Sequence, residues 1–254
     1  MQQVGFNMKR KDLRTETKKF IVRMKKNWER KHWDVNSPNF EKKLQEAMRF
    51  YLLAAQLKYK IRTGWDEHHW NVKGEKEKVA EHVYGTCILA IALDSEFDLG
   101  INLNKVLKML AIHEIGEVLI GDITPFDNIT VEEKKAMEHK AMADILGDLC
   151  KKEEMLDLLM EFDEHKTKES QFAYLCDKIE ADIQAKVYQD TGRQHDLDNQ
   201  ENNVVFNNSK AKQMVEDGAQ TAFDIWYLWD KDKYQDSPLF QKVLTYIKDN
   251  NTNI

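Results

Sequence analysis

Three side chains that can bind a metal ion or exchange protons lie together in a strongly apolar segment. His113, Glu114 and Glu117 fall within residues 104–121, where most other positions are Leu, Ile, Val, Met or Ala. As a helix, this segment is apolar on nearly all sides, which is typical of a buried core helix, and it carries the three side chains on neighbouring faces. An unpaired carboxylate in a core is costly. The segment therefore predicts a compensating cation.

The same pattern recurs in two other apolar segments. His82 precedes an apolar run near Cys87, and Asp177 directly follows Phe172–Cys176. Taken singly, each has an ordinary explanation, because a lone histidine on an apolar face is often a core residue and a lone aspartate is often a capping or surface group. Recurrence on three segments favours one shared site with the ligands His82, His113, Glu114 and Asp177. Two imidazoles and two carboxylates suit one divalent ion of manganese, cobalt, iron or zinc better than magnesium.

Helices are expected to hold these side chains. Ser37-Pro38 and Ser237-Pro238 each place a capping hydroxyl before a proline, and Thr130 with Glu133 forms a capping box. Val204–Phe206 is expected to be a packed loop, with a short strand as the alternative. The predicted fold class is all-α. Apolar spacing predicts helices over residues 11–31, 38–60, 76–95, 104–121, 131–151, 153–166, 169–190, 209–231 and 238–249.

Composition narrows the class of protein. The 254 residues are 42% hydrophobic and include three cysteines without a CxxC pair. This argues against a disulfide framework and favours reduced thiols and a cytoplasmic location. A charged N-terminus without an apolar h-region gives no sign of a signal peptide, and no run approaches the ~20 apolar residues of a membrane span. We therefore expect no membrane partner.

Charge is unevenly distributed along the chain. Residues 9–31 contain eleven Lys or Arg and three Asp or Glu, while the whole chain has a net charge of −6. We therefore expect a basic N-terminal arm over residues 1–37 and an acidic domain over 38–254. The arm could contact nucleic acid. The favoured alternatives are a solvated helix face, or docking on the acidic domain or on a second subunit.

Five runs of the sequence carry a resemblance to a known family: Arg62–Trp65, Glu81-His82, His113–Pro125, Asp127–Lys134 and Cys176–Glu180. Together they resemble the HD-domain metal-dependent phosphohydrolases, and within them the bacterial 5′-deoxynucleotidases and their eukaryotic relatives. The resemblance covers residues 55–190, extends loosely toward 248 and leaves out 1–50. It implies an HD-type helical bundle with an extra N-terminal helical arm.

The resemblance implies a role for each matching residue. The four candidate ligands stand where the family binds its metal ion, and Glu117 stands where the family handles the attacking water. Asp122 matches an aspartate near the sugar, and Arg62 an arginine that contacts the phosphate. Trp65 is expected to line the nucleoside side of the pocket. Glu117, Asp122 and Arg62 are thus the expected catalytic residues, and Arg62, Trp65 and Asp122 the expected substrate-binding ones.

The expected activity is hydrolysis of a (deoxy)nucleoside 5′-monophosphate to nucleoside and phosphate. A triphosphate or another phosphorylated metabolite is an alternative substrate, and relatives imply a homodimer. One departure matters, because the chain has His113-Glu114 where the family has His-Asp. A catalytically weak regulatory or binding protein is therefore a further alternative. The literal His195-Asp196 lies in a polar segment and is expected at the surface. His139 and His165, also expected at the surface, could instead supply a second metal.

Overall fold

The structure is a computed structural model that describes residues 18–19, 22, 34–127, 129–200 and 202–253. It divides into two units, Met1–Met48 and Arg49–Ile254. The expected arm over 1–37 and the expected helix over 11–31 lie almost wholly outside the described residues, so both stay predictions.

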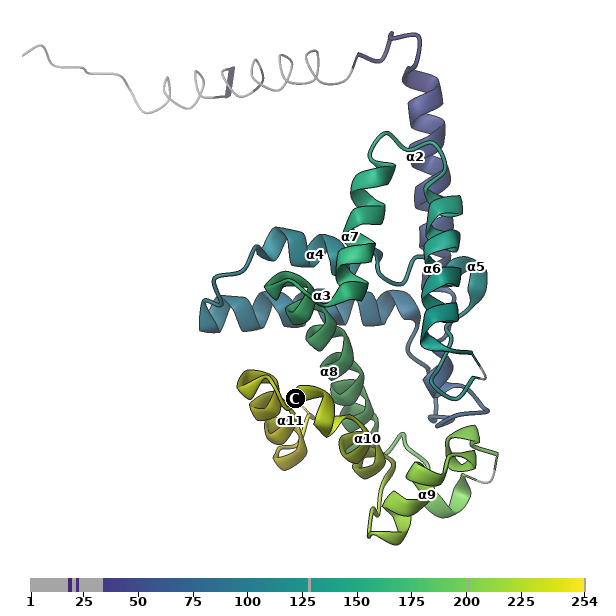
Figure 1. Ribbon diagram of the computed structural model, residues 1–254, viewed down its shortest axis with the longest axis vertical. Coiled ribbons are helices and arrows are strands. Elements are labelled where there is room, and N and C mark those ends of the chain that lie inside the picture. Colours follow the sequence, from purple (N-terminus) through teal and green to yellow (C-terminus); the bar gives the residue numbers. More distant parts are fainter. Residues whose placement is uncertain (1–17, 20–21, 23–33, 128, 201, 254) are drawn as a thin grey trace, which may run out of the picture. The chain divides into compact units, whose positions relative to one another are not determined.

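The described residues form α-helices and 3₁₀ helices, and their one β pairing is an isolated bridge between Ile61 and Lys78. The all-α prediction is confirmed. None of the described helices combines the length and the apolar character that crossing a bilayer requires. The α-helices in Figure 1 are α2 (Phe40–Ala54), α3 (Val79–Phe97), α4 (Leu103–Ile112), α5 (Glu117–Ile120), α6 (Val131–Leu146), α7 (Lys152–Glu164), α8 (Lys168–Asp190), α9 (Ser209–Glu216), α10 (Ala222–Asp230) and α11 (Pro238–Asp249). The 3₁₀ helices are η1 (Ala55–Lys58), η2 (Thr63–Trp65), η3 (Leu197–Asn199), η4 (Val204–Asn207) and η5 (Lys231–Tyr234).

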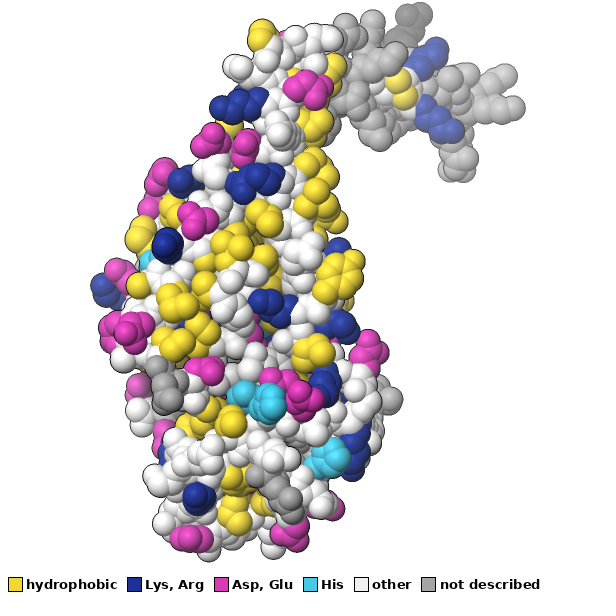
Figure 2. Space-filling model, turned by 90° about the vertical axis from the view of Figure 1, so that its right-hand side faces the viewer, with side chains coloured by type: hydrophobic (Ala, Val, Ile, Leu, Met, Phe, Trp, Pro, Cys, Tyr) yellow, Lys and Arg dark blue, Asp and Glu magenta, His cyan; other side chains and the backbone are white. Residues whose placement is uncertain are grey.

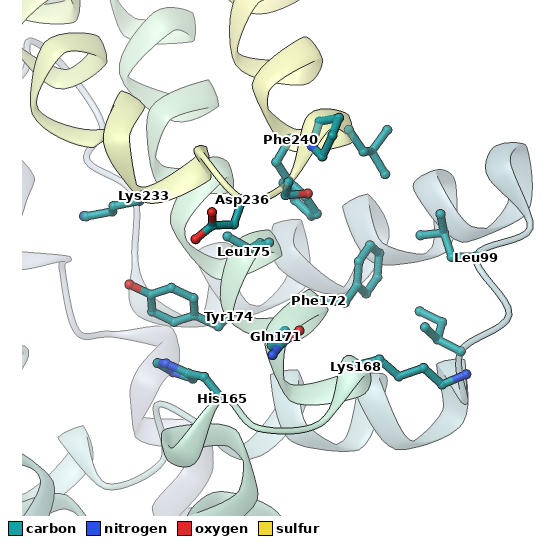
Figure 3. A pocket seen from close by; sticks show the side chains of 14 residues that line it. Leu99, His165, Lys168, Gln171, Phe172, Tyr174, Leu175, Lys233, Asp236 and Phe240 are labelled. Atoms are coloured by element: carbon teal, nitrogen blue, oxygen red, sulfur yellow. The ribbon is translucent and has the colours of Figure 1, made fainter.

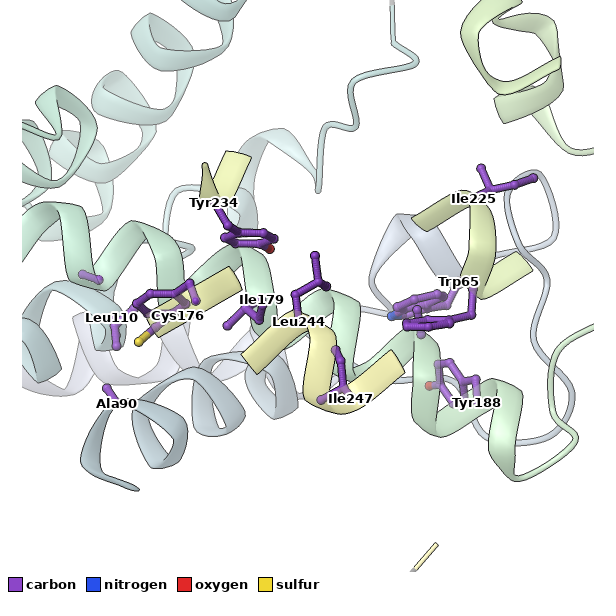
Figure 4. Packing of buried hydrophobic residues seen from close by; sticks show 14 of the residues in the cluster. Trp65, Ala90, Leu110, Cys176, Ile179, Tyr188, Ile225, Tyr234, Leu244 and Ile247 are labelled. Carbon is purple, nitrogen blue, oxygen red and sulfur yellow. The ribbon is translucent and has the colours of Figure 1, made fainter. Parts of the chain in front are cut away.

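Helix α8 is the central element of the unit. It contacts α3, α4, α7, α10 and α11, and about half of its 23 residues are buried. Figure 4 shows Cys176, Ile179 and Tyr188 from α8 within the main core, beside side chains of α3, α4, α10 and α11. A second, smaller core lies among α6, α7 and η1. A side chain on α8 can therefore meet groups from most of the other helices.

A buried polar cluster joins α8 to the C-terminal helices. Tyr234 donates a hydrogen bond to Asp182 over 2.5 Å, and Lys233 forms an ion pair of 2.7 Å with Asp230. Asp182 and Asp230 are both buried. Burial, then the nearby Asp230 carboxylate, raises the pKa of Asp182 well above its ordinary value, against the opposing effects of Tyr234, Lys233 and Lys178. Asp182 therefore holds a proton to a higher pH than an exposed aspartate does.

The surface of the second unit is mixed in charge. Figure 2 shows acidic and basic side chains interspersed with exposed hydrophobic ones on one face. Exposed apolar side chains include Leu119, Val131 and Met137. Interspersed charge of both signs is the usual character of a water-exposed protein surface.

Most predicted helix positions agree with the structure to within a few residues, but two predicted helices were wrong. The one over 104–121 ends at Ile112, and residues 113–116 form turns with hydrogen bonds three residues apart before α5 begins. Gly116 here lies against the backbone of Glu138 in α6, so the break accompanies a close helix approach. The one over 209–231 divides at Gly218, whose φ of +107° interrupts the helical backbone. Thr221 then caps α10.

Smaller differences have local causes. The capping box of Thr130 and Glu133 is confirmed, with both reciprocal hydrogen bonds present. Helix α6 ends at Leu146 because Gly147 adopts a left-handed φ of +55°. The expected packed loop at Val204 is the 3₁₀ helix η4, with Val205 buried in the main core.

Candidate metal centre

Three helices and one turn bring the four predicted ligands together. His82 lies in the first turn of α3, His113 caps the C-terminus of α4, Glu114 follows in the turn, and Asp177 lies in the middle of α8. One ligand atom from each side chain lies within 4.8 Å of the others. Residues almost a hundred positions apart thus meet at one point, because α3 and α4 both pack on α8.

The separations between ligand atoms match those expected around one ion. Asp177 Oδ1 lies 2.9 Å from His82 Nε2 and 3.5 Å from His113 Nε2. Glu114 Oε1 lies 3.3 Å from His113 Nε2 and 3.8 Å from His82 Nε2. Nitrogen and oxygen ligands placed about 2.1 Å from a tetrahedral ion lie about 3.4 Å from each other. The four side chains therefore fit a single divalent metal ion.

Both imidazoles are held so that Nε2 faces the carboxylates. His113 Nδ1 donates to the carbonyl oxygen of Leu110 over 2.8 Å, and His82 Nδ1 donates to Glu180. In the neutral imidazole with its proton on Nδ1, Nε2 has a lone pair that a metal ion can bind. His113 Nε2 is buried and makes no hydrogen bond. Without a metal ion, a proton on Nε2 can lie between an imidazole and these carboxylates, and His82 Nε2 is 2.9 Å from Asp177 Oδ1. A metal ion would replace such protons and bind both imidazoles and both carboxylates at once.

The electrostatics of the cluster favour a cation. Burial lowers the pKa of His113, but the Glu114 and Asp177 carboxylates outweigh it and raise that pKa to about 10. Burial raises the pKa of Glu114, but His113 outweighs it and holds that pKa below its ordinary range. The pKa of Asp177 is also well below its usual range, because Lys178 and the two histidines outweigh burial. Both carboxylates therefore stay ionised at neutral pH.

Glu117 is the first residue of the short helix α5, and Asp122 lies just beyond its C-terminal end. Glu117 is only 2% exposed, and its Oε2 makes no hydrogen bond. Burial, then the charge of Glu114, raises the pKa of Glu117 well above its ordinary value. Asp122 Oδ2 accepts a hydrogen bond of 2.7 Å from the backbone N–H of Thr63, and the Thr63 hydroxyl donates back to the Asp122 carbonyl oxygen. These bonds tie Asp122 to the turn that carries Arg62.

The turn Arg62–Trp65 is built on a buried carboxylate. Glu77 Oε2 accepts a hydrogen bond of 2.8 Å from Trp65 Nε1 and lies 3.5 Å from the Arg62 guanidinium. Trp65 is 1% exposed and stacks on Trp226 with ring centroids 5.0 Å apart. It therefore belongs to the core beneath the turn, and its expected substrate contact stays a prediction. Arg62 is 18% exposed and lies 4.0 Å from Glu180.

Three neighbouring residues were not singled out by the sequence. Glu180 accepts a hydrogen bond from His82, and Glu77 forms an ion pair with Arg62. Lys178, whose side chain is 36% exposed, forms an ion pair of 2.7 Å with Asp177 Oδ2. Glu180 had a usable signal, since it is an acid one helical turn from Asp177 on a helix with a buried face. Glu77 had none, because it lies in a polar segment whose path depends on tertiary contacts.

The other candidate histidines lie outside this cluster. His139 Nε2 is hydrogen-bonded to Asp163 Oδ2 over 2.5 Å, and His165 packs on the Tyr174 ring, with centroids 3.9 Å apart. Neither belongs to a possible metal-binding group among the described residues. Asp196 is exposed, in line with the expected surface position, while His195 is partly buried. His69, in contrast, is buried and contacts Asp66 and Thr124.

A separate cavity of about 520 Å³ lies between the first half of α8 and the start of α11. Figure 3 shows Phe172 and Phe240 at one side of it and His165 and Tyr174 at the other. Its two lysines are already engaged, because Lys168 donates to the carbonyl oxygen of Gly100 and Lys233 pairs with Asp230. The cavity is thus a weaker place for a phosphate than the four-residue cluster.

Comparison with known proteins identifies the fold family. Residues 54–219 match the family described as HD domain. The chain belongs to the HD-domain family. The 5′-deoxynucleotidase HDDC2 of Dictyostelium discoideum is 33% identical over 163 residues, covering 61% of this chain and 83% of that protein. The 5′-deoxynucleotidase hdd1 of Schizosaccharomyces pombe is 33% identical over 141 residues, covering 53% of this chain and 68% of that protein.

Solved structures share this HD-domain fold. The PH0347 protein of Pyrococcus horikoshii superposes with a TM-score of 0.57 at 20% identity, covering 79% of this chain and 97% of that one. A predicted metal-dependent phosphohydrolase from Magnetospirillum magnetotacticum gives a TM-score of 0.51 at 25% identity, covering 61% of this chain and 76% of that one. The expected resemblance to HD-domain metal phosphohydrolases is confirmed at the level of the family.

Proposed function

We propose that this HD-domain chain hydrolyses deoxynucleoside 5′-monophosphates to nucleoside and inorganic phosphate, with one divalent metal ion held by His82, His113, Glu114 and Asp177. The observation that carries the proposal is the meeting of these four side chains within 4.8 Å, two of them imidazoles with Nε2 facing ionised carboxylates. The names of the curated relatives, which are 5′-deoxynucleotidases, support the substrate class.

The bound ion would supply a Lewis acid that neutralises phosphate charge and makes water more acidic. The chain supplies the rest. Burial and Glu114 raise the pKa of Glu117, and the positive charge of the bound ion would lower it again and favour the carboxylate. In that form Glu117, buried with one oxygen that makes no hydrogen bond, accepts a proton from the attacking water. The water oxygen bonds to phosphorus as the bond from phosphorus to the 5′ oxygen breaks, and that oxygen takes a proton from solvent as the nucleoside leaves. Glu117 then returns its own proton to solvent. No covalent enzyme intermediate is needed.

Substrate placement is assigned to the turn beside the cluster. The Arg62 guanidinium contacts phosphate oxygens, and Asp122 accepts a hydrogen bond from the sugar. Thr63 supports this assignment because its two hydrogen bonds to Asp122 couple the two groups. Trp65 contributes indirectly, because it donates a hydrogen bond to Glu77, and Glu77 forms the ion pair that orients Arg62. Manganese, cobalt, iron and zinc suit the nitrogen and oxygen donors better than magnesium does.

Product analysis tests the proposal. Purified protein is incubated with deoxynucleoside mono- and triphosphates, and inorganic phosphate is separated from pyrophosphate and tripolyphosphate. We expect inorganic phosphate and nucleoside from the monophosphates. Release of tripolyphosphate from a triphosphate would instead identify a triphosphate hydrolase. Glu117→Gln, which keeps the side chain's size, should abolish release, and full activity in that variant would overturn the role of Glu117.

A second candidate function is binding or regulation with little turnover. The Glu114 departure favours it, since glutamate is one methylene longer than the family's aspartate. An inactive wild type that gains activity on Glu114→Asp would support this candidate. Metal identity, a cytoplasmic location and a homodimer also remain predictions. Nucleic-acid binding by residues 1–37 remains the less favoured role of the arm.

A further inference from the structure

The Glu180 carboxylate lies behind His82, on the side away from the cluster, and has no part in the proposed mechanism. Glu180 lies on α8, one turn beyond Asp177, and accepts the Nδ1–H hydrogen bond of His82. His82 is fully buried. Its imidazole can therefore face the cluster through Nε2 only while Nδ1 keeps a partner on the opposite side. His113 has the same arrangement, with the Leu110 carbonyl oxygen as the Nδ1 partner.

The packing of α3 on α8 makes room for this carboxylate at one position. Gly85 lies one turn after His82 on α3. A Cβ atom there would lie 3.0 Å from Glu180 Cδ and closer still to Oε1, whereas real Cβ atoms essentially never approach other atoms more closely than 3.0 Å. The backbone of Gly85 is not left-handed. Glycine at this position therefore leaves space for the Glu180 side chain. The backbone conformation does not by itself require glycine there.

A buried ion-pair network holds Glu180 from the far side. The Arg62 guanidinium lies 4.0 Å from Glu180 and 3.5 Å from Glu77. Glu77, His82 and Glu180 could in principle form a second metal site. The guanidinium already supplies positive charge to both carboxylates, and the Nδ1 atom of His82 is engaged in its hydrogen bond. The network therefore fits a support for His82 better than a second ion.

We propose that Glu180 is a positioning residue that fixes the tautomer and direction of His82 for metal binding, and that Gly85 is glycine because this carboxylate needs its space. The inference rests on the proposed metal site and deepens it. Outer-layer carboxylates that orient metal-binding histidines commonly change metal affinity by about 10- to 100-fold when removed. Metal affinity, measured without substrate, is thus the property that the proposal predicts to change.

The test is cobalt binding by metal-stripped protein, followed by the visible absorption of Co²⁺ and by competition with a chelator of known affinity. We expect one Co²⁺ per chain in the wild type. Glu180→Ala should weaken binding by about 10- to 100-fold and change the absorption spectrum. Glu180→Gln should retain most of the affinity, because its amide oxygen can still accept the Nδ1–H bond. Gly85→Ala should weaken binding like Glu180→Ala.

Matched controls separate this role from general destabilisation. Asp182→Asn alters another buried acid on α8, and Gly64→Ala adds a Cβ that meets nothing within 4 Å. Both should bind Co²⁺ like the wild type. The double variant Gly85→Ala/Glu180→Ala should bind no more weakly than Glu180→Ala alone, because the new methyl group then displaces no carboxylate.

Cobalt binding distinguishes failure of the Glu180 role from failure of the metal site. Wild-type affinity and spectrum in folded Glu180→Ala, checked by far-ultraviolet circular dichroism, would overturn the positioning role while leaving the metal site intact. Two Co²⁺ ions per chain would overturn it as well, in favour of a second site at Glu77. Failure of the wild type to bind Co²⁺ would overturn the metal site itself and this inference with it.

Discussion

The substitution Gly116→Ala tests how the turn between α4 and α5 places the acids of the cluster. Gly116 lies between Glu114 and Glu117 and is buried. Its φ of −56° is ordinary for any residue, so alanine causes no backbone strain of its own. The added Cβ, however, would lie 3.0 Å from the carbonyl oxygen of Glu138 and 3.3 Å from its Cα atom. The turn and α6 must therefore move apart.

The size of the effect follows from these distances. The contact with the Glu138 oxygen is 0.4 Å shorter than the 3.4 Å at which ordinary contacts begin, and the obstacle is backbone rather than a flexible side chain. Overpacking of this kind costs about 1–3 kcal/mol, while replacing glycine stabilises by about 0.4–1 kcal/mol through the unfolded chain. We expect a net loss of about 1–2 kcal/mol. In a domain of this size that lowers Tm by about 3–6 °C.

Thermal unfolding followed by circular dichroism, together with phosphate release, measures both consequences. Gly116→Ala should melt earlier and lose activity at temperatures where it remains folded, since Glu114 and Glu117 flank the displaced residue. Gly64→Ala is the matched control, because its Cβ meets nothing within 4 Å. It should melt no earlier than the wild type. Equal Tm and equal activity in Gly116→Ala would refute the close approach of α6 to this turn.

Three further predictions concern charge, ligand length and metal. Because the folded pKa of Asp182 is raised, its contribution to stability is complete below the unfolded value of 3.8 and is lost as pH rises toward the folded value. Asp182→Asn should therefore gain stability relative to the wild type as pH rises, by up to about 1.4 kcal/mol per unit in urea unfolding, and a pH-independent difference would contradict this. Glu114→Asp should weaken metal binding by at least about tenfold, because the shorter side chain moves its carboxylate away from His113 Nε2 and His82 Nε2, which now lie 3.3 and 3.8 Å from it. Tighter binding in a metal titration would show that the site suits aspartate. Chelation should lower Tm by about 5–10 °C if metal is initially at 100 times its Kd, and an unchanged Tm would argue against a buried metal site.

The sequence predicted the parts of the fold that depend on local chemistry. The capping box at Thr130 and the proline start of α11 need only neighbouring residues, and both are present. The meeting of His82, His113 and Asp177 followed from polar groups in apolar helices, which must find partners somewhere in the core. The family resemblance then suggested that they share one site.

Features set by contacts between distant segments could not be predicted. The helix break after Ile112 accompanies the approach of α6 to Gly116, and apolar spacing carries no sign of that approach. The sequence also carried no sign that Trp65 stacks on Trp226 and donates a hydrogen bond to Glu77 within the core. The pairing of Glu180 with His82 depends on how α3 lies on α8, which a single sequence does not specify.

The central claim is that one metal ion at the four-residue cluster drives phosphate release. The most direct measurement titrates Mn²⁺ or Co²⁺ into metal-stripped protein while bound metal and phosphate release from a deoxynucleoside 5′-monophosphate are both recorded. The account predicts that release rises with bound metal, saturates at one ion per chain and disappears in His113→Ala, which removes a ligand. Release that is independent of metal, or that persists in folded His113→Ala, would contradict it.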